Sequence, residues 1–423
     1  MISSLEQPLT RQFEQYFGKS GNTQTLTLAE IRNTLRKVEE ATGVKPALIY
    51  ATFVPQVLVA DAGTNASYPV PNSNLDIQNS EDQLELVLVT AEGEPIRHRV
   101  TGTTRENVLK VVRQFQSEVT NAQSGRAYEA PGQELYQWFV TPLQADLKAR
   151  GIQNLSFIMD RGLRSIPMAA LYDGQQFLIE QYSIGLMPSL SLTDTRYKSL
   201  KDAEVLAMGA ANFTAQKPLP AVPVELSVIT SSLWEGKSFL NDAFTLSNLK
   251  AQRNQEPFGV IHLATHASFR AGSPKNSYIQ LWDTKLGLDQ LRELGWSNPA
   301  VELLVLSACK TALGDEDAEL GFAGLAVQAG VKSAIASLWS VSDEGTLALM
   351  TELYQQLKQS PIKAEGLRQA QIAMLNRQVT LKDGKLITPT ATVPLPPELA
   401  KLGTKDLTHP YFWAGFTMIG SPW

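Results

Sequence analysis

Six short and almost uninterrupted apolar runs constrain the fold of this 423-residue chain more than any other feature. They lie beyond residue 150, between longer amphipathic segments, and read SFIMD, EVLAMGA, VIHLAT, ELLVLSA, SAIASLW and FTMIG. Continuous apolar residues, as opposed to alternating ones, are typical of strands that are covered on both faces. The pattern therefore predicts an α/β fold in which helices flank a mostly parallel central sheet.

The residues before this alternation predict a smaller α/β region. Residues 1–45 carry apolar side chains three and four positions apart, with Thr27 as the expected helix N-cap and Gly43 as the helix stop. Two apolar stretches that precede and surround a turn at Gly93 predict strands. A stretch rich in Gly, Ser and Pro at residues 122–132 then predicts a boundary, so residues 1–130 form the first region.

Charge and composition exclude several classes of partner. The chain has 37 Lys and Arg against 42 Asp and Glu, a net charge of −5, and no basic stripe that could neutralise a row of phosphates. No segment approaches the roughly 18 uninterrupted apolar residues of a membrane span, and the N-terminus lacks the pattern of a secretory signal. We therefore expect a cytoplasmic protein that binds neither nucleic acid nor membrane, in keeping with its single cysteine.

Two of the predicted strands end in residues that could form a catalytic pair. VIHLAT leads into His266, and ELLVLSA leads into Cys309, 43 residues later. The carboxyl ends of parallel strands meet at one edge of a sheet, and this spacing is close to that of caspases. A thiolate is a strong nucleophile, and a neighbouring histidine can protonate a leaving amine. The backbone N–H groups of Ala267 and Cys309 would then hold the oxyanion.

Each of these features also has a structural interpretation. A free cysteine is often buried, and a histidine at a strand end often bonds a nearby carbonyl. The pair His262 and His266 has an HxxxH spacing, but Leu263 replaces the glutamate of a zinc protease and the segment is not helical. Residues 314–321, GDEDAELG, place their glycine one position late for a calcium loop, which predicts a solvated acidic loop. We expect no metal and no cofactor, and calcium dependence is not indicated.

Several stretches together resemble a known family. They are VIHLATH, LLVLSACKTA, GFAGLAVQAGVKSAIASLWSVSDEGT, LRSIPMAAL and HPYFWAGFTMIGSPW. These are similar to CHAT domains, the caspase-like and separase-like cysteine peptidases of clan CD, and TGVKPALIYATFVP is similar to the region before the module in cyanobacterial relatives. The resemblance implies a caspase-like three-layer α/β sandwich with an N-terminal non-catalytic α/β half. On this basis residues 131–200 are the non-catalytic part of the module and residues 201–423 the catalytic part.

The resemblance also implies roles for individual residues. His266 and Cys309 match the catalytic dyad, and Asp343 matches an acidic position near the S1 pocket of separase-like enzymes. A carboxylate there would favour Arg or Lys at the cleavage site. Alternatively, Asp343 caps a helix that begins at residue 344. Trp339 either lines the same pocket or fills the core, and both alternatives stay open at this point.

Two departures from the family pattern bear on activity. Many relatives have Gly after the catalytic histidine, where this chain has Ala267. If that residue needed a positive φ, alanine would cost roughly 1 kcal/mol of strain. The chain also lacks the helical repeats that often precede such modules, so it is either a natural stand-alone module or an excised piece of a larger protein. A helical-repeat or regulatory protein is the partner that the resemblance implies.

The sequence therefore predicts a cysteine endopeptidase that acts on protein substrates, after Arg or Lys. The alternative is a weakly active or inactive scaffold of the same fold that binds a protein partner. A thiol redox protein fits less well, because there is no second cysteine to resolve an oxidised intermediate. Some relatives are linked to heterocyst differentiation, so the resemblance implies a developmental role by analogy only.

Overall fold

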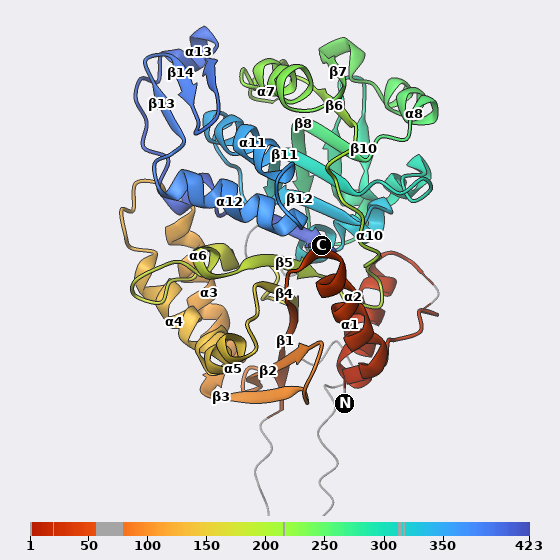
Figure 1. Cartoon of the computed structure of the whole chain (residues 1–423), viewed down its shortest axis with the longest axis vertical. Coiled ribbons are helices and arrows are strands. Elements are labelled where there is room, and N and C mark those ends of the chain that lie inside the picture. The colour runs from red at the N-terminus through yellow and green to blue at the C-terminus, as the bar shows by residue number, and fades with distance from the viewer. Residues whose placement is uncertain (1, 20, 56–78, 215, 312–314, 316–317) are drawn as a thin grey trace, which may run out of the picture.

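The structure is a computed structural model that describes residues 2–19, 21–55, 79–214, 216–311, 315 and 318–423. Within these residues, a sheet of 13 strands runs in the order β10-β9-β8-β11-β12-β16-β5-β4-β1-β2-β3, with β6 beside β8 and β7 beside β6. Figure 1 shows the N-terminal half below, in red to yellow, and the C-terminal half above, in green to blue. The sheets of the two halves meet where β16 lies parallel to β5, through the residue pair Ile419 and Leu186.

Within the 13-stranded sheet, more strand pairs are parallel than antiparallel, as the apolar runs predict. Parallel pairs join β6 to β7 and β8, β8 to β11, β11 to β12, β1 to β4, and β5 to β4 and β16. The strands are β1 Pro46–Val54, β2 Gln83–Thr90, β3 Ile96–Thr104, β4 Asn154–Met159, β5 Ser183–Met187, β6 Val205–Gly209, β7 Gly236–Leu240, β8 Val260–Phe269, β9 Tyr278–Gln280, β10 Lys285–Gly287, β11 Leu303–Thr311, β12 Ser333–Ser337, β13 Thr380–Lys382, β14 Lys385–Ile387, β15 Thr392–Pro394 and β16 Phe416–Gly420.

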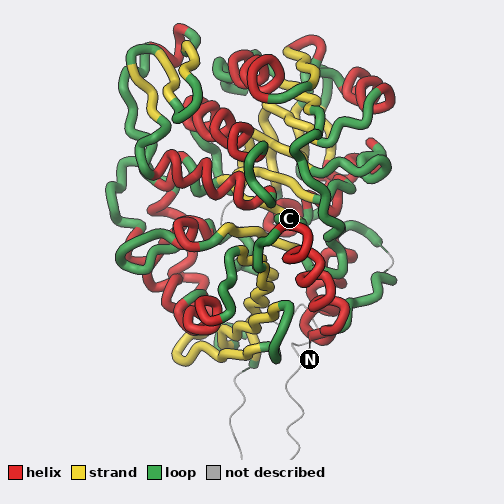
Figure 2. Tube along the Cα trace, viewed as in Figure 1, coloured by secondary structure: helices red, strands yellow, loops and turns green. Residues whose placement is uncertain are grey.

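Helices flank this sheet, and Figure 2 shows them outside the strands in both halves. They are α1 Ile2–Tyr16, α2 Leu28–Thr42, α3 Arg105–Val119, α4 Glu129–Phe139, α5 Gln144–Ala149, α6 Leu178–Gln181, α7 Val222–Val228, α8 Leu246–Gln255, α9 Ala318–Ala323, α10 Leu325–Ala329, α11 Asp343–Leu357, α12 Lys363–Leu375 and α13 Pro397–Ala400. Helix α11 packs against both α7 and α12, so these three helices form one layer. In the described part of the chain, no helix combines the length and the apolar character that a bilayer crossing needs.

The first of the predicted helices is confirmed in its details. Thr27 accepts a hydrogen bond from the N–H of Glu30, and the Glu30 side chain bonds back to the Thr27 N–H. This capping box satisfies two N–H groups that have no partner within the helix. Gly43 ends the helix with a positive φ of 72°, a conformation that costs glycine little.

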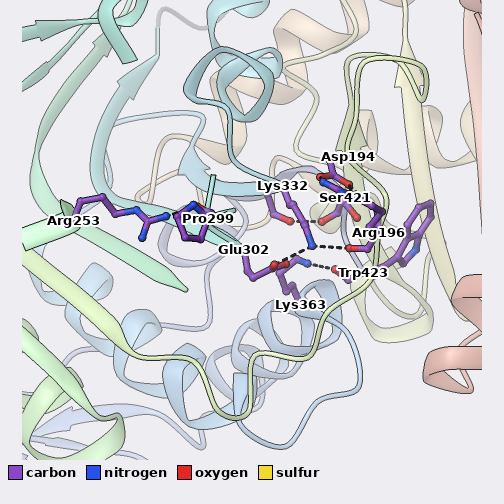
Figure 3. Close-up of polar contacts among 10 residues, drawn as sticks. Asp194, Arg196, Arg253, Pro299, Glu302, Lys332, Lys363, Ser421 and Trp423 are labelled. Carbon is purple, nitrogen blue, oxygen red and sulfur yellow. Dashed lines mark hydrogen bonds and ion pairs between the residues drawn. The ribbon is translucent and has the colours of Figure 1, made fainter. Parts of the chain in front are cut away.

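A buried polar cluster ties the connection between the halves to the C-terminal half (Figure 3). The Lys332 ammonium lies 2.9 Å from a Glu302 carboxylate oxygen and donates to the carbonyl of Arg196, in the connection, at 2.8 Å. Lys363 donates to the carbonyl of Trp423, and burial lowers the pKa of Lys363 to about 8. Because a buried ammonium is costly unless it is paired, these contacts fix how the connection lies against β12 and α12.

The structure departs from the sequence prediction in two places. Strands β8 and β11 do not end at His266 and Cys309 but continue to Phe269 and Thr311. Strands β5, β7, β9 and β10 are short and were not predicted. Residues 386–403, a proline-rich stretch between α12 and β16, include most of β14, β15 and helix α13, and β13, β14 and β15 form a small separate sheet.

Candidate active site

The site lies at one edge of the parallel strands of the C-terminal half. Strands β6, β8, β11 and β12 are neighbours and run in the same direction. The segments that follow them therefore emerge at the same edge, which is where open α/β sheets place their sites. This edge brings together the segment after β6, the last residues of β8 and β11, and the start of α11.

The register of β8 and β11 brings the two predicted catalytic residues alongside each other. Ala308 is opposite His266, and Cys309 is opposite Ala267. The register shifts just before this point. Leu306 is opposite Leu263 and Ala308 is opposite His266, so β8 has one residue more than β11 between these two pairs. Such a bulge inserts one extra residue and changes the direction of nearby side chains, and bulges are frequent beside active sites. The side chain of Cys309 lies outside the described part, so the backbone alone places this residue.

The segment after β6 orients the His266 ring. Its Nε2 lies 2.8 Å from the carbonyl oxygen of Lys217, and the Phe213 ring packs against it with centroids 4.7 Å apart. A carbonyl oxygen can only accept, so Nε2 carries the hydrogen. The other ring nitrogen, Nδ1, is then the one that can exchange a proton with a reacting group.

Asp343 also contacts the segment that follows β6. It is the first residue of α11, and the N-cap is Ser342, whose hydroxyl accepts from the Gly345 N–H at 3.1 Å. The expectation that Asp343 caps a helix starting at 344 is therefore wrong. Instead, its Oδ2 accepts the Ala221 N–H at 2.7 Å. Burial, helped by the nearby carboxylates of Glu225 and Glu344 and opposed by the hydrogen bond from Ala221, raises the pKa of Asp343 to about 7.

Trp339 is buried in the core between β12 and the C-terminal segment. Its indole N–H donates to the Tyr411 carbonyl at 3.1 Å. The ring lies so close to Gly415 that an added Cβ there would come within 2.9 Å of it. These contacts occupy the ring and its polar atom, and a role in a substrate pocket stays a prediction.

Ala267 has the extended backbone of a strand and not a positive φ. It is opposite Cys309 on one side and Ile279 of β9 on the other. The strain expected if alanine replaced a left-handed glycine therefore does not arise here. The assignment of the oxyanion site to the N–H groups of Ala267 and Cys309 stays a prediction.

The acidic stretch after Cys309 is not a solvated loop throughout. Glu319 of α9 is 2% exposed and accepts hydrogen bonds from the Gly162 N–H at 2.9 Å and from the Ser165 hydroxyl. Both partners belong to the N-terminal half. The expectation of a solvated loop is wrong for Glu319, because a carboxylate that is this well bonded can be buried. Asp315 is half-buried and accepts the Ala318 N–H at 3.1 Å, and residues 314, 316 and 317 lie outside the described residues.

His262, four positions before His266 on β8, is a core residue. Its Nδ1 lies 3.0 Å from the Tyr354 hydroxyl, and its Nε2 lies 2.9 Å from a Glu225 carboxylate oxygen. All three side chains are buried. No cluster of three or more His, Cys, Asp or Glu side chains suited to a metal occurs in the described ranges.

Sequence reasoning missed the groups that the segment after β6 contributes. The Lys217 carbonyl and the Ala221 N–H are backbone atoms, so no residue type reveals them. One signal was available, since the prolines of KPLPAVP mark a loop after the predicted strand EVLAMGA. A loop in that position follows a parallel strand and so belongs to the edge where a site is expected.

Comparisons with solved structures show a caspase-like α/β fold of the separase type. Separase of Saccharomyces cerevisiae, solved with securin, superposes with a TM-score of 0.51 and 9% identity over 98% of this chain. The match covers 33% of the separase chain, so this chain spans a third of its length. The RgpB pro- and mature domains of Porphyromonas gingivalis give a TM-score of 0.41 with 12% identity over 75% of each chain. Among curated proteins, none matches the sequence.

The CHAT domain model matches residues 129–421, which is more than half of the chain. The chain therefore belongs to the CHAT domain family, as its sequence motifs indicate. Its expected fold, a mostly parallel sheet flanked by helices, is confirmed.

Proposed function

We propose that this chain is a cysteine endopeptidase that cleaves proteins after Arg or Lys. The observation that carries the proposal is the pairing of β8 with β11, which sets Cys309 opposite Ala267. Ala267 directly follows His266, whose ring is oriented by the Lys217 carbonyl. The separase fold and the CHAT family support the same class of enzyme. A regulatory protein partner is part of this proposal, because the similar separase was solved bound to securin.

The chemistry follows from the two side chains. The Cys309 thiolate attacks the substrate carbonyl carbon, and the carbonyl electrons move to oxygen, where the N–H groups of Ala267 and Cys309 would stabilise them. Protonated His266 gives its Nδ1 proton to the departing amine, so the C–N bond breaks and a thioester remains. Neutral His266 then takes a proton from water, which hydrolyses the thioester and restores the thiolate.

Labelling with an Arg-directed electrophile tests this proposal most directly. We expect the wild-type protein to gain one inhibitor mass at Cys309, and Cys309→Ala to gain none. Mapping of new protein N-termini in a lysate should show Arg or Lys before each cleaved bond, with wild type but not with Cys309→Ala. Labelling that persists in Cys309→Ala would remove the proposed nucleophile.

A specific observation favours a second candidate function, a scaffold without catalysis. Ala267 lies between two paired strands, β11 and β9, so its N–H belongs to the sheet unless that pairing opens. An oxyanion site needs N–H groups that are free to turn to the substrate. Absence of both labelling and turnover from pH 6 to 9, with and without calcium, would favour the scaffold.

Asp343 predicts a pH-dependent preference for Arg. With a pKa of about 7, its carboxyl is mostly neutral at pH 6 and mostly ionised at pH 8. Only the ionised form can pair with an Arg side chain. We expect the ratio of kcat/KM for an Arg peptide to that for its neutral citrulline analogue to rise about tenfold over this range.

The Arg-to-citrulline ratio cancels the ionisation of the dyad, which affects both peptides equally. In Asp343→Asn the ratio should be low and independent of pH. Asp406→Asn, which removes a surface carboxylate paired with Arg377, should behave as wild type. A ratio that rises equally in Asp343→Asn would assign the preference to another group.

A further inference from the structure

An open groove with a volume of about 390 Å³ lies beside the candidate site and is not used by the mechanism above. One wall is the segment after β6, and the other is formed by β9, β10 and their turn. The residues that bear on its chemistry are Phe213, Gln216, Tyr278, Gln280, Trp282 and Lys285.

The groove lies on the histidine side of the dyad. Strands β11 and β9 flank β8 on opposite sides, so His266 lies on the strand between Cys309 and the groove. Phe213 lines the groove and also packs against the His266 ring. Tyr278 of β9 is opposite Ser268, two residues after His266.

This position indicates which part of a substrate the groove would receive. In the proposed reaction, Cys309 bonds to the carbonyl carbon and His266 protonates the amine that leaves. The amine begins the segment on the carboxyl side of the cleaved bond. That segment therefore leaves the dyad on the side of His266, where the groove begins.

The groove walls combine exposed aromatic rings with positive charge. Trp282 is 43% exposed, and in the described residues Leu402 is the other large apolar side chain with comparable exposure. The Lys285 ammonium lies 4.4 Å from the Tyr278 ring centre, and the Arg270 guanidinium lies 5.5 Å from it. The exposed part of an aromatic ring offers apolar surface to a peptide.

No carboxylate balances these cations in the part of the chain that the structure describes. The groove lining contains no Asp or Glu, and no ion pair of the described residues involves Lys285 or Arg270. The acid nearest in sequence, Asp283, accepts the Leu246 N–H at 3.4 Å. Charge complementarity therefore favours a negatively charged peptide.

We propose that this groove binds the substrate segment on the carboxyl side of the cleaved bond and selects a segment that carries Asp or Glu. Trp282 provides the apolar contact, and Lys285 provides the charge. The inference rests on the proposed peptidase function and adds a determinant of specificity to it.

Kinetics with two internally quenched peptides test the inference. They share an amino-side sequence ending in Arg and differ in having Glu or Gln at the second to fourth positions after it, so that neither peptide gains a second cleavage site. An Arg coumarylamide, which has no residues on that side, is the reference substrate. We expect the wild type to prefer the Glu peptide about tenfold, and Lys285→Glu to lose or invert this preference. Trp282→Ala should lower kcat/KM for the Glu peptide relative to the coumarylamide about tenfold.

Matched controls lie in the small separate sheet and the turn after α13. Lys385→Glu changes an exposed lysine that also begins a three-residue strand, and Leu402→Ala removes the other exposed apolar side chain. Both should keep the wild-type ratios. Equal rates for the Glu and Gln peptides in the wild type would overturn the inference, as would a loss of preference in Lys385→Glu equal to that in Lys285→Glu.

A binding measurement separates failure of the groove from failure of the peptidase. Fluorescein-labelled versions of the two peptides are titrated against Cys309→Ala, with fluorescence anisotropy as the readout. In one outcome, no substrate is turned over, the Glu peptide binds about tenfold tighter, and Lys285→Glu in the same background removes the difference. This result would support the proposed groove and contradict the proposed peptidase activity. Equal binding of both peptides overturns the groove.

Discussion

His266→Ala should lower kcat/KM for an Arg peptide by about 10³-fold, because the variant loses the group that protonates the leaving amine. The same substitution also removes the imidazolium that stabilises the thiolate. The remaining activity should therefore rise steadily with pH toward the pKa of an ordinary thiol, near 8.5. Initial rates between pH 6 and 9 measure both effects.

The chain provides a matched control for this prediction. His98 of β3 is exposed and lies in the N-terminal half, so His98→Ala should retain the wild-type rate and pH profile. A second check measures whether Cys309 and His266 act on the same reaction step. The double variant of Cys309→Ala and His266→Ala should be no slower than Cys309→Ala alone. If the two losses multiply, the side chains do not act on one reaction step.

Local chemistry explains which parts of the fold could be predicted. The capping box of Thr27 and Glu30 depends on residues within one turn, so the start of α2 was predictable from the sequence. The parallel sheet was predictable because strands covered on both faces need continuous apolar residues. The short strands β9 and β10 have no such pattern. They form because β9 pairs with the end of β8 and β10 pairs with β9.

That His266 and Cys309 lie on neighbouring strands was predictable from the sequence, but the local geometry around them was not. His266 and Cys309 follow apolar runs, and that pattern placed them at one sheet edge. The bulge before the pair Ala308 and His266 sets the register of β8 against β11. It depends on the packing of the two strands, and no residue pattern in either strand predicts it. The orientation of His266 depends on the Lys217 carbonyl, an atom that every residue possesses.

Glu319 shows why a cluster of acids was misinterpreted. Clustered Asp and Glu residues usually face solvent, and the partners of this one are 154 and 157 positions away in the chain. Sequence offers no means to find such partners. Their distance also makes Glu319 a direct link between the start of α9, just beyond the Cys309 strand, and the N-terminal half.

Glu319→Ala should therefore destabilise the whole protein, lowering the free energy of unfolding by about 3 kcal/mol. The substitution leaves the Gly162 N–H and the Ser165 hydroxyl without their buried acceptor. It also removes a negative charge near the guanidinium of Arg164, which is itself buried. Urea unfolding at pH 7, followed by tryptophan fluorescence, measures the change.

Two further variants show whether the buried hydrogen bonds cause this loss. Glu319→Gln keeps one acceptor oxygen, for Gly162 or Ser165, and loses the charge and the second acceptor, so it should cost less than Glu319→Ala. Glu365→Ala removes a half-buried carboxylate that pairs with Arg368 within α12 and should cost less than about 1 kcal/mol. If Glu319→Ala is no more destabilising than Glu365→Ala, the contacts of Glu319 with the N-terminal half contribute little. The two halves would then be held by apolar packing and by the Lys332 cluster without help from the segment that follows Cys309.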